Sequence, residues 1–221
     1  MNGPESSARL ILASASPARL RTLRAAGIEP DVLVSGVDED SVSESDPGRL
    51  SLRLAELKAE AVARRVISGP LILGCDSVLG FDGEIYGKPA SAAEAVARWQ
   101  RMRGGTGTLH TGHCLIDTAT GRSTSAVADT LVRFAKITDA EIAAYVATGE
   151  PLAVAGGFTI DGLGGPFVEG VEGDPGTVIG LSLPLLRTLL ARFGIPVTAL
   201  WSSRLRKTSD NNFPAREEAV S

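Results

Sequence analysis

The chain has 221 residues, of which 43% are hydrophobic and 22% charged, and this composition excludes disorder as its main state. The net charge of −4 argues against a protein that binds duplex nucleic acid through its overall field, because such proteins are normally basic. Cys75 and Cys114, each in an apolar run, indicate buried thiols in a reducing compartment rather than a disulfide framework. Because no signal peptide and no membrane-spanning run is recognisable, we expect a cytoplasmic protein without a membrane partner.

The first half of the chain alternates apolar runs with helical patterns. In chain order we predict a strand at 9–13, a helix from Pro17 to Gly27, a strand at 31–35, an acidic loop at 38–46, a helix with Leu50, Leu54, Leu57 and Ala61 on one face, and a strand at 71–75. The first helix has a complete signature, with Ser16 as N-cap, Pro17 at its first position and Gly27 past its end.

The second half contains a hairpin pair between helices. In chain order we predict a turn at Asp82-Gly83, a helix opened by a Ser91/Glu94 capping box, strands at 107–117 and 124–136, a helix opened by a Thr138/Glu141 capping box, a Gly-rich segment at 155–165, and a last helix from about Ser182 to Gly194. Alternating strands and helices, interrupted by a hairpin, predict an α/β fold with a mixed sheet. We expect one domain at 9–200, with flexible termini at 1–8 and 201–221.

The first candidate site is the strand–turn–helix segment from Ser14 to Arg19. The N-terminus of a helix offers unpaired N–H groups and a partial positive charge, so it binds phosphate readily. Ser14 and Ser16 add hydroxyls, and Arg19 adds a forked cation. The alternative is that Ser16 is only an N-cap and Arg19 a surface residue.

The second candidate is Asp76, which follows five apolar residues at the predicted end of an interior strand. Ligands of open α/β sheets gather at the carboxyl ends of strands, and a carboxylate there is costly unless a metal, a cation or a water needs it. A capped, structurally satisfied aspartate is the alternative.

Two lysines complete the candidates. Lys58 lies at the margin of the apolar helix face, and Lys88 sits between Gly87 and Pro89 on a rigid mount. Both would suit a triphosphate, and both could equally be surface lysines. His110 and His113 are three apart on a predicted strand and so point to opposite faces, which argues against a shared metal.

Taken together, these segments resemble the Maf family of nucleoside triphosphate pyrophosphatases. The resemblance runs from about residue 9 to residue 195 and rests on an ordered set of motifs. They are Leu12-Ala-Ser-Ala-Ser-Pro17 with Arg19, Gly36-Val-Asp-Glu39, Arg53-Leu-Ala-Glu-Leu-Lys58, Gly74-Cys-Asp-Ser77, Gly87-Lys-Pro89, and Glu150-Pro151 through Ala155-Gly156 to Ile160 and Gly162.

The resemblance implies an elongated fold of two lobes, similar to inosine triphosphatases, with the active site in a cleft between them. It implies hydrolysis between the α- and β-phosphates of a nucleoside triphosphate, giving monophosphate and pyrophosphate. Asp76 matches the proton acceptor, and Ser14, Arg19, Glu39, Lys58 and Lys88 match polar positions lining the site. Glu39 and Asp76 would hold a divalent cation, Mg²⁺ or alternatively Mn²⁺. Related proteins often form homodimers, and the family's link to septum formation leaves a non-catalytic nucleotide-binding regulator as the alternative.

Three positions depart from the family's dTTP- and UTP-selective branch. That branch carries a second arginine, a threonine and a glutamine where this chain has Ala18, Ser77 and Asp161. An ionised aspartate only accepts hydrogen bonds, whereas a glutamine also donates them. We therefore expect Asp161, as part of a pocket wall, to give a different substrate profile, and a broader one because Ala18 also opens space. The alternative is that Asp161 only caps the Gly-rich turn.

Overall fold

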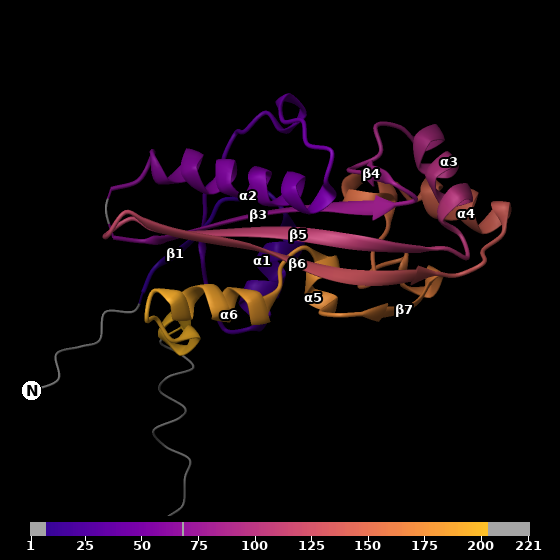
Figure 1. Cartoon of the computed structure of the whole chain (residues 1–221). Helices are drawn as coiled ribbons and strands as arrows, with labels where there is room; N and C mark the ends of the chain where they lie inside the picture. Colours follow the sequence, from indigo (N-terminus) through magenta and orange to yellow (C-terminus); the bar gives the residue numbers. More distant parts are fainter. Residues whose placement is uncertain (1–7, 68, 203–221) are drawn as a thin grey trace, which may run out of the picture.

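The computed structural model describes residues 8–67 and 69–202, and its core is one mixed sheet of seven strands (Figure 1). The order along the sheet is β2-β1-β3-β5-β6-β7, and β4 pairs with β3 outside this path. The strands are β1 Leu10–Leu12, β2 Asp31–Val32, β3 Leu71–Phe81, β4 Glu84–Tyr86, β5 Thr106–Asp117, β6 Arg122–Phe134 and β7 Val168–Glu172. Only β1 pairs in parallel, with β2 and with β3, while the other pairs are antiparallel. The predicted α/β fold with a mixed sheet is thus confirmed.

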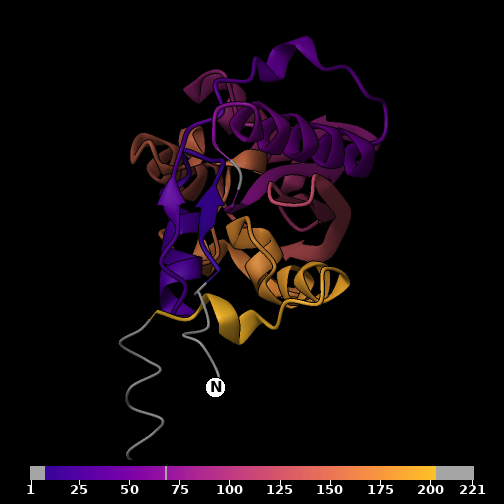
Figure 2. The ribbon, with the colours of Figure 1, turned by 90° about the vertical axis from the view of Figure 1, so that its left-hand side faces the viewer.

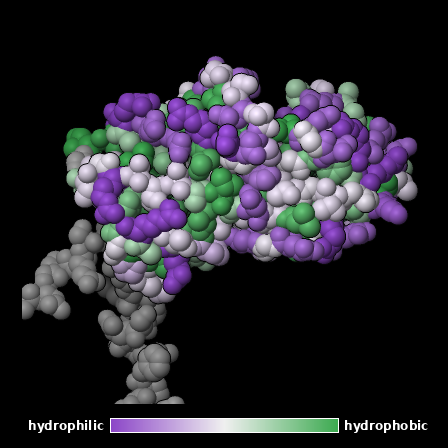
Figure 3. Space-filling view, viewed as in Figure 1, coloured by the Kyte–Doolittle hydropathy of each residue, from purple (hydrophilic) through white to green (hydrophobic). Residues whose placement is uncertain are grey.

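Helices cover both faces of this sheet. They are α1 Pro17–Ala25, α2 Pro47–Ala63, α3 Ala92–Met102, α4 Asp139–Ala147, α5 Pro175–Ile179 and α6 Leu183–Arg192. Figure 2, which looks along the sheet, shows α2 on one face and α6 on the other. On the face seen in Figure 3, hydrophilic side chains spread over both ends of the molecule and apolar ones form small, separate areas. No helix among the described residues is long and apolar enough to cross a membrane.

The buried apolar residues divide the molecule into two lobes. In the first lobe, one cluster packs α1 and α6 against β1 and β3, and another packs α2 against the opposite face. In the second lobe, Trp99 and Phe134 lie at the centre of an aromatic cluster that joins α3 and α4 to the far ends of β3, β5 and β6. The long strands run through both lobes, and they give the molecule its elongated shape (Figure 1).

Local signals predicted most of the helix starts. Ser16, Thr138 and Ser182 cap α1, α4 and α6 through their side chains, and Asp46, which was predicted only as part of the acidic loop, caps α2. The Thr138/Glu141 capping box is confirmed. At α3, Ser91 caps as predicted, but Glu94 accepts from the Ala90 N–H and from Arg98 instead of closing the box.

Strand lengths were predicted less well. β2 is only two residues long, and β3 continues from Cys75 through Asp76 to Phe81, because β5 pairs with it along its whole length. The prediction that Asp76 ends a strand was therefore wrong. Strand β7 and helix α5 were not predicted at all.

The predicted boundaries of the termini fall mostly on residues 1–7 and 203–221, which lie outside the described residues. Within the described part, Trp201 and Ser202 were assigned to the flexible tail, but Trp201 forms a β-bridge with Ile28, and the Ser202 N–H donates to the Gly27 carbonyl at 2.9 Å.

A buried neutral histidine joins β5 to the start of α6. His113 is fully buried; its Nδ1 donates to the Thr111 carbonyl at 3.0 Å, and its Nε2 accepts from the Ser182 N–H at 2.9 Å. Burial lowers the pKa of His113 to about 4, although the bond to Thr111 opposes this shift. The imidazole is therefore neutral at physiological pH, and each nitrogen has a defined role.

We expect His113 to make folding sensitive to acid. Below a pH of about 6.5 the unfolded chain binds a proton that the folded chain does not, so the free energy of unfolding falls as the pH falls towards 4. The loss should reach roughly 3 kcal/mol. Urea titrations of wild type and His113→Gln between pH 7 and 4 measure it. The variant should be less stable at pH 7 and should lose less stability on acidification; equal slopes would contradict this assignment.

Candidate active site

The candidate site surrounds a stretch of β3 that is paired along one edge only. On that edge β3 pairs with β1 up to Leu73 and with β4 from Leu79, so among the described strands only β5 pairs with the residues between them. Asp76 lies in the middle of this gap, just past the point where the parallel pairing with β1 stops. Side chains from both faces of the sheet can therefore approach Asp76 around the open edge.

Three charged side chains form the centre of the site. Lys58 Nζ of α2 lies 2.5 Å from Asp76 Oδ1 and 2.7 Å from Glu39 Oε1, so a single ammonium group joins both carboxylates. The Lys58 and Asp76 side chains are 7% and 8% exposed, whereas Glu39 is 49% exposed. Lys58 is therefore no surface lysine, and the structure brings together three predicted residues that are far apart in the sequence.

Close packing of α2 on the sheet positions Lys58. A Cβ atom on Gly74 would lie 2.2 Å from the Ala55 carbonyl oxygen, and one on Gly112 would lie 2.2 Å from the Ser51 carbonyl oxygen. Only glycine fits at such distances. This close approach of the two backbones packs the middle of α2, from Ser51 to Ala59, against β3 and β5, and Lys58 lies on this part of the helix.

The two carboxyl groups have opposite pKa shifts. Burial raises the pKa of Asp76, and the charges of Lys58 and Arg19 only partly oppose that rise. Partial burial would also raise the pKa of Glu39, but the hydrogen bond from Lys58 and the charges of Lys58, Lys88 and Arg19 hold it below its ordinary value. Asp76 is thus the better proton acceptor, and Glu39 keeps its negative charge to lower pH.

Arg19 is buried on the other face of β3, and its side chain is fixed by three hydrogen bonds. Nε donates to the Gly180 carbonyl at 2.8 Å, Nη1 to Ser14 Oγ at 3.0 Å and Nη2 to Ser77 Oγ at 3.1 Å. The alternative of a surface arginine is excluded, because Arg19 is only 8% exposed. Its link to Gly180 could not be predicted, since the two residues are 161 positions apart.

The turn before α1 contains both predicted serines. Ser16 Oγ accepts from the Arg19 N–H at 3.4 Å, so Ser16 is the N-cap. Ser14 is buried, and its Oγ accepts from Arg19 and also from the Ser16 N–H at 3.2 Å. Ala18 is half-buried on the first turn of α1, whereas Ser77 contacts Thr111 Oγ1 at 2.9 Å as well as Arg19.

Lys88 reaches the site from the second lobe. Lys88 is an exposed residue, and its positive charge helps to lower the pKa of Glu39. The preceding Gly87 carbonyl accepts from Arg98 Nη1 at 2.7 Å and from the Gly156 N–H at 3.1 Å. The backbone before Lys88 is therefore held from two sides, which agrees with the rigid position predicted for this lysine.

Asp161 differs from the expectation of an unmatched group in a pocket wall. Its side chain is 37% exposed, and its Oδ2 lies 3.6 Å from Arg21 Nη2 on α1. Arg21 was not predicted as a site residue, although Ala18 and Arg21 are three apart on one helix and so share a face. The ion pair connects the Gly-rich segment of the second lobe to α1 of the first.

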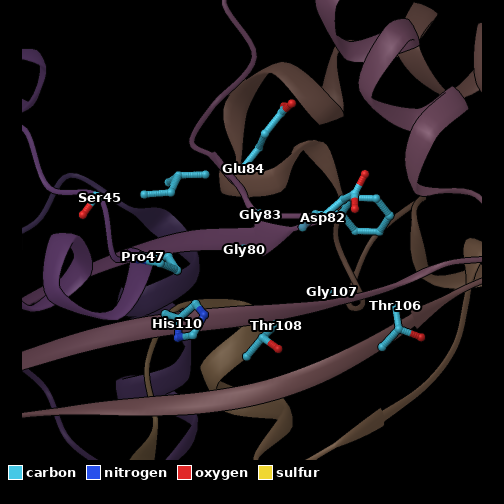
Figure 4. A pocket seen from close by; sticks show the side chains of 12 residues that line it. Ser45, Pro47, Gly80, Asp82, Gly83, Glu84, Thr106, Gly107, Thr108 and His110 are labelled. Atoms are coloured by element: carbon cyan, nitrogen blue, oxygen red, sulfur yellow. The ribbon is translucent and has the colours of Figure 1, made fainter.

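A surface cavity lies elsewhere, and none of the predicted site residues lines it. It has a volume of about 450 Å³ and lies between the start of α2, the β3–β4 hairpin and His110 (Figure 4). Its acidic residues Asp82 and Glu84 both pair with Arg101, and His110 pairs with Asp129 at 2.7 Å. The buried charges around Asp76, rather than this cavity, have the features of a reactive centre.

Comparison with known proteins agrees with the motifs at this centre. A family model described as Maf-like protein matches residues 9–193. The chain is 63% identical, over 93% of its length and 92% of the other, to a protein of Salinispora tropica named nucleoside triphosphate pyrophosphatase. It is 60% identical to a Streptomyces coelicolor protein of the same name, over 90% of this chain and 97% of that one. This chain belongs to the Maf family.

Among solved structures, a HAM1 protein from Coxiella burnetii is 14% identical, covers 93% of this chain and 100% of its own, and has a TM-score of 0.43. That likeness is too slight to support any statement about function.

Proposed function

We propose that this chain is a nucleoside triphosphate pyrophosphatase whose reaction takes place at the open edge of β3. Water adds to phosphorus, the bond between the α-phosphorus and the oxygen that bridges it to the β-phosphorus breaks, and nucleoside monophosphate and pyrophosphate leave. The observation that carries this proposal is the cluster of the buried Asp76 and Lys58 with the half-exposed Glu39, next to Arg19. Such a cluster favours catalysis over a non-catalytic regulator of septum formation, because nucleotide binding alone does not need a buried carboxylate with a raised pKa.

Asp76 would take the proton of the attacking water. A free aspartate has a pKa of about 3.9 and is a weak base, so the upward shift caused by burial makes Asp76 better suited to this role. Lys58 holds Asp76 Oδ1 in place at 2.5 Å, which leaves Oδ2 as the oxygen that would face the water.

The cations would neutralise the triphosphate. Phosphoryl transfer needs positioning and neutralisation of charge more than covalent chemistry. Arg19 uses three of its five N–H groups in the bonds to Ser14, Ser77 and Gly180, so it would bind phosphate with the others. Lys88 would approach the phosphates from the second lobe, and Ser14 and Ser16 would add donors at the start of α1.

Glu39 and Asp76 would hold a divalent cation. Mg²⁺ typically takes one or two carboxylates and completes its shell with substrate phosphates and water, so this donor set fits it, and Mn²⁺ prefers similar oxygen ligands. Within residues 8–67 and 69–202 no group of three or more His, Cys, Asp or Glu residues is placed to bind a metal. When bound, the ion would neutralise charge that develops on the phosphate oxygens.

A pyrophosphate-release assay over a panel of nucleoside triphosphates tests this function. We expect release with Mg²⁺ and none after chelation. Absence of pyrophosphate from every triphosphate, with either Mg²⁺ or Mn²⁺, would contradict the proposal.

We propose that Asp161 selects the base together with Arg21, since a paired aspartate and arginine present both acceptors and donors. Asp161→Gln removes the charge of the acceptor, so the ranking of dTTP, UTP, CTP and GTP by kcat/KM should change, by roughly tenfold for at least one of them. Asp139→Asn, which alters another exposed arginine pair of the second lobe, is the matched control and should keep the ranking. The same ranking in Asp161→Gln would place Asp161 outside base selection.

Two further properties are proposed. Homodimer formation follows from the family resemblance. A cytoplasmic location follows from Cys75 and Cys114, which are both free and buried; burial raises the pKa of each thiol to about 12.

A further inference from the structure

We propose that Glu150 is a positioning residue, which fixes the loop 159–164 in the shape that the nucleobase of the substrate meets. The inference rests on the proposed function, because it gives this loop a role in binding the nucleoside part of a triphosphate. Glu150 itself is half-buried behind the loop and acts through it.

The Glu150 carboxylate is a centre of hydrogen bonding. Its Oε1 accepts from Tyr145 Oη at 2.9 Å, from Thr159 Oγ1 at 2.6 Å and from the Gly164 N–H at 3.0 Å, while Oε2 accepts from the Leu163 N–H at 3.0 Å. Partial burial would raise the pKa of Glu150, but these donors together hold it below its ordinary value. One ionised side chain thus binds the loop at both of its ends, with Asp161 between them.

The loop is closed so tightly on this centre that its glycines have no room for a side chain. A Cβ atom on Gly162 would lie 2.5 Å from Glu150 Oε2, and one on Gly164 would lie 2.4 Å from Tyr145 Oη. The glycines therefore allow the backbone to come close to the side chains of Glu150 and Tyr145. Such packing favours one loop shape.

The loop 159–164 and the turns before it lie between α1, which carries Arg19, and the segment that carries Lys88. Asp161 at its tip pairs with Arg21, two residues after Arg19 on α1. On the other side, the Gly156 N–H donates to the carbonyl of Gly87, the residue before Lys88. A triphosphate held between Arg19 and Lys88 would place its nucleoside next to this segment, which leaves Leu163 59% exposed there.

A preformed loop lowers the entropic cost of binding, so loosening it should weaken binding of the nucleoside and leave the phosphate chemistry unchanged. We therefore expect loosening of the loop to raise KM and to leave kcat nearly unchanged. Inorganic tripolyphosphate has phosphates but no base, so its binding tests only the phosphate half of the site. It therefore separates phosphate binding from nucleoside binding.

The experiment compares wild type with Glu150→Gln, and uses Glu141→Gln as a matched control. Glu141 lies in the same lobe and also accepts two hydrogen bonds from a backbone N–H and a hydroxyl, both of Thr138. We expect Glu150→Gln to raise KM for the preferred triphosphate about tenfold, with kcat within about threefold and an unchanged inhibition constant for tripolyphosphate. Glu141→Gln should match wild type in all three.

An unchanged KM in Glu150→Gln would overturn the proposal. So would a weakening of tripolyphosphate binding equal to that of triphosphate binding, because that result means a general distortion of the site. Should Glu150→Gln fail to fold, Tyr145→Phe removes one donor to the same carboxylate and should raise KM about threefold; no change there would also overturn it. Failure of the proposed function itself would be seen separately, as a wild-type protein that releases pyrophosphate from no triphosphate.

Discussion

Replacing Asp76 by asparagine should lower kcat by about 10²–10⁴-fold, because the amide has nearly the same shape but cannot accept the proton of the attacking water. Nucleotide binding should largely survive, since Arg19 and Lys88 remain. Steady-state rates with saturating Mg²⁺ measure the loss, and binding of a non-hydrolysable triphosphate measures what remains.

The wild-type pH profile gives this prediction a second test. Burial raises the pKa of Asp76, and a base must be deprotonated to act, so kcat should fall with decreasing pH at values above the ordinary range of an aspartate. In Asp76→Asn the residual rate should lose that acidic limb. A kcat near that of wild type in the variant would show that another group is the base.

Arg19→Ala should reduce both activity and stability. The change removes a buried cation and leaves the Gly180 carbonyl, Ser14 and Ser77 without their shared donor, which should lower the free energy of unfolding by about 3 kcal/mol. For a chain of this size that corresponds to a fall in Tm of roughly 6–12 °C. We expect kcat/KM to fall about 10²–10³-fold for every triphosphate, because the guanidinium acts on phosphate.

Lys88→Ala is the matched comparison for Arg19. Lys88 is exposed, so its removal should weaken handling of all triphosphates while leaving Tm close to that of wild type. Loss of activity towards a single base in either variant would contradict a role in phosphate binding.

The parts of the fold that could be predicted are those determined by local signals. Ser16 with Pro17 and Thr138 with Glu141 favour a helix start, since capping depends on neighbouring residues. The length of β3 depends instead on its pairing with β5, whose partner residues Thr108 to Asp117 lie far along the chain. That pairing carries the strand through the polar residues Asp76 and Ser77, where a sequence pattern indicates an end.

In the candidate site, too, local patterns predicted some of the residues, whereas their contacts depend on the folded chain. The predicted residues Lys58, Glu39 and Asp76 do meet, but the bridging position of Lys58 comes from the backbone contact of α2 with Gly74, which no local pattern reveals. Arg21 and Glu150 were missed as parts of the site, because their roles depend on contacts that α1 and the Gly-rich loop make only in the folded chain.

The most direct test of the account is the identity of the products formed in ¹⁸O-labelled water. With wild type, Mg²⁺ and a nucleoside triphosphate, we predict equal amounts of nucleoside monophosphate and pyrophosphate, the monophosphate carrying a single ¹⁸O, and no nucleoside diphosphate. Formation of nucleoside diphosphate and free phosphate would mean cleavage of the terminal bond, and would contradict the proposed reaction at Asp76.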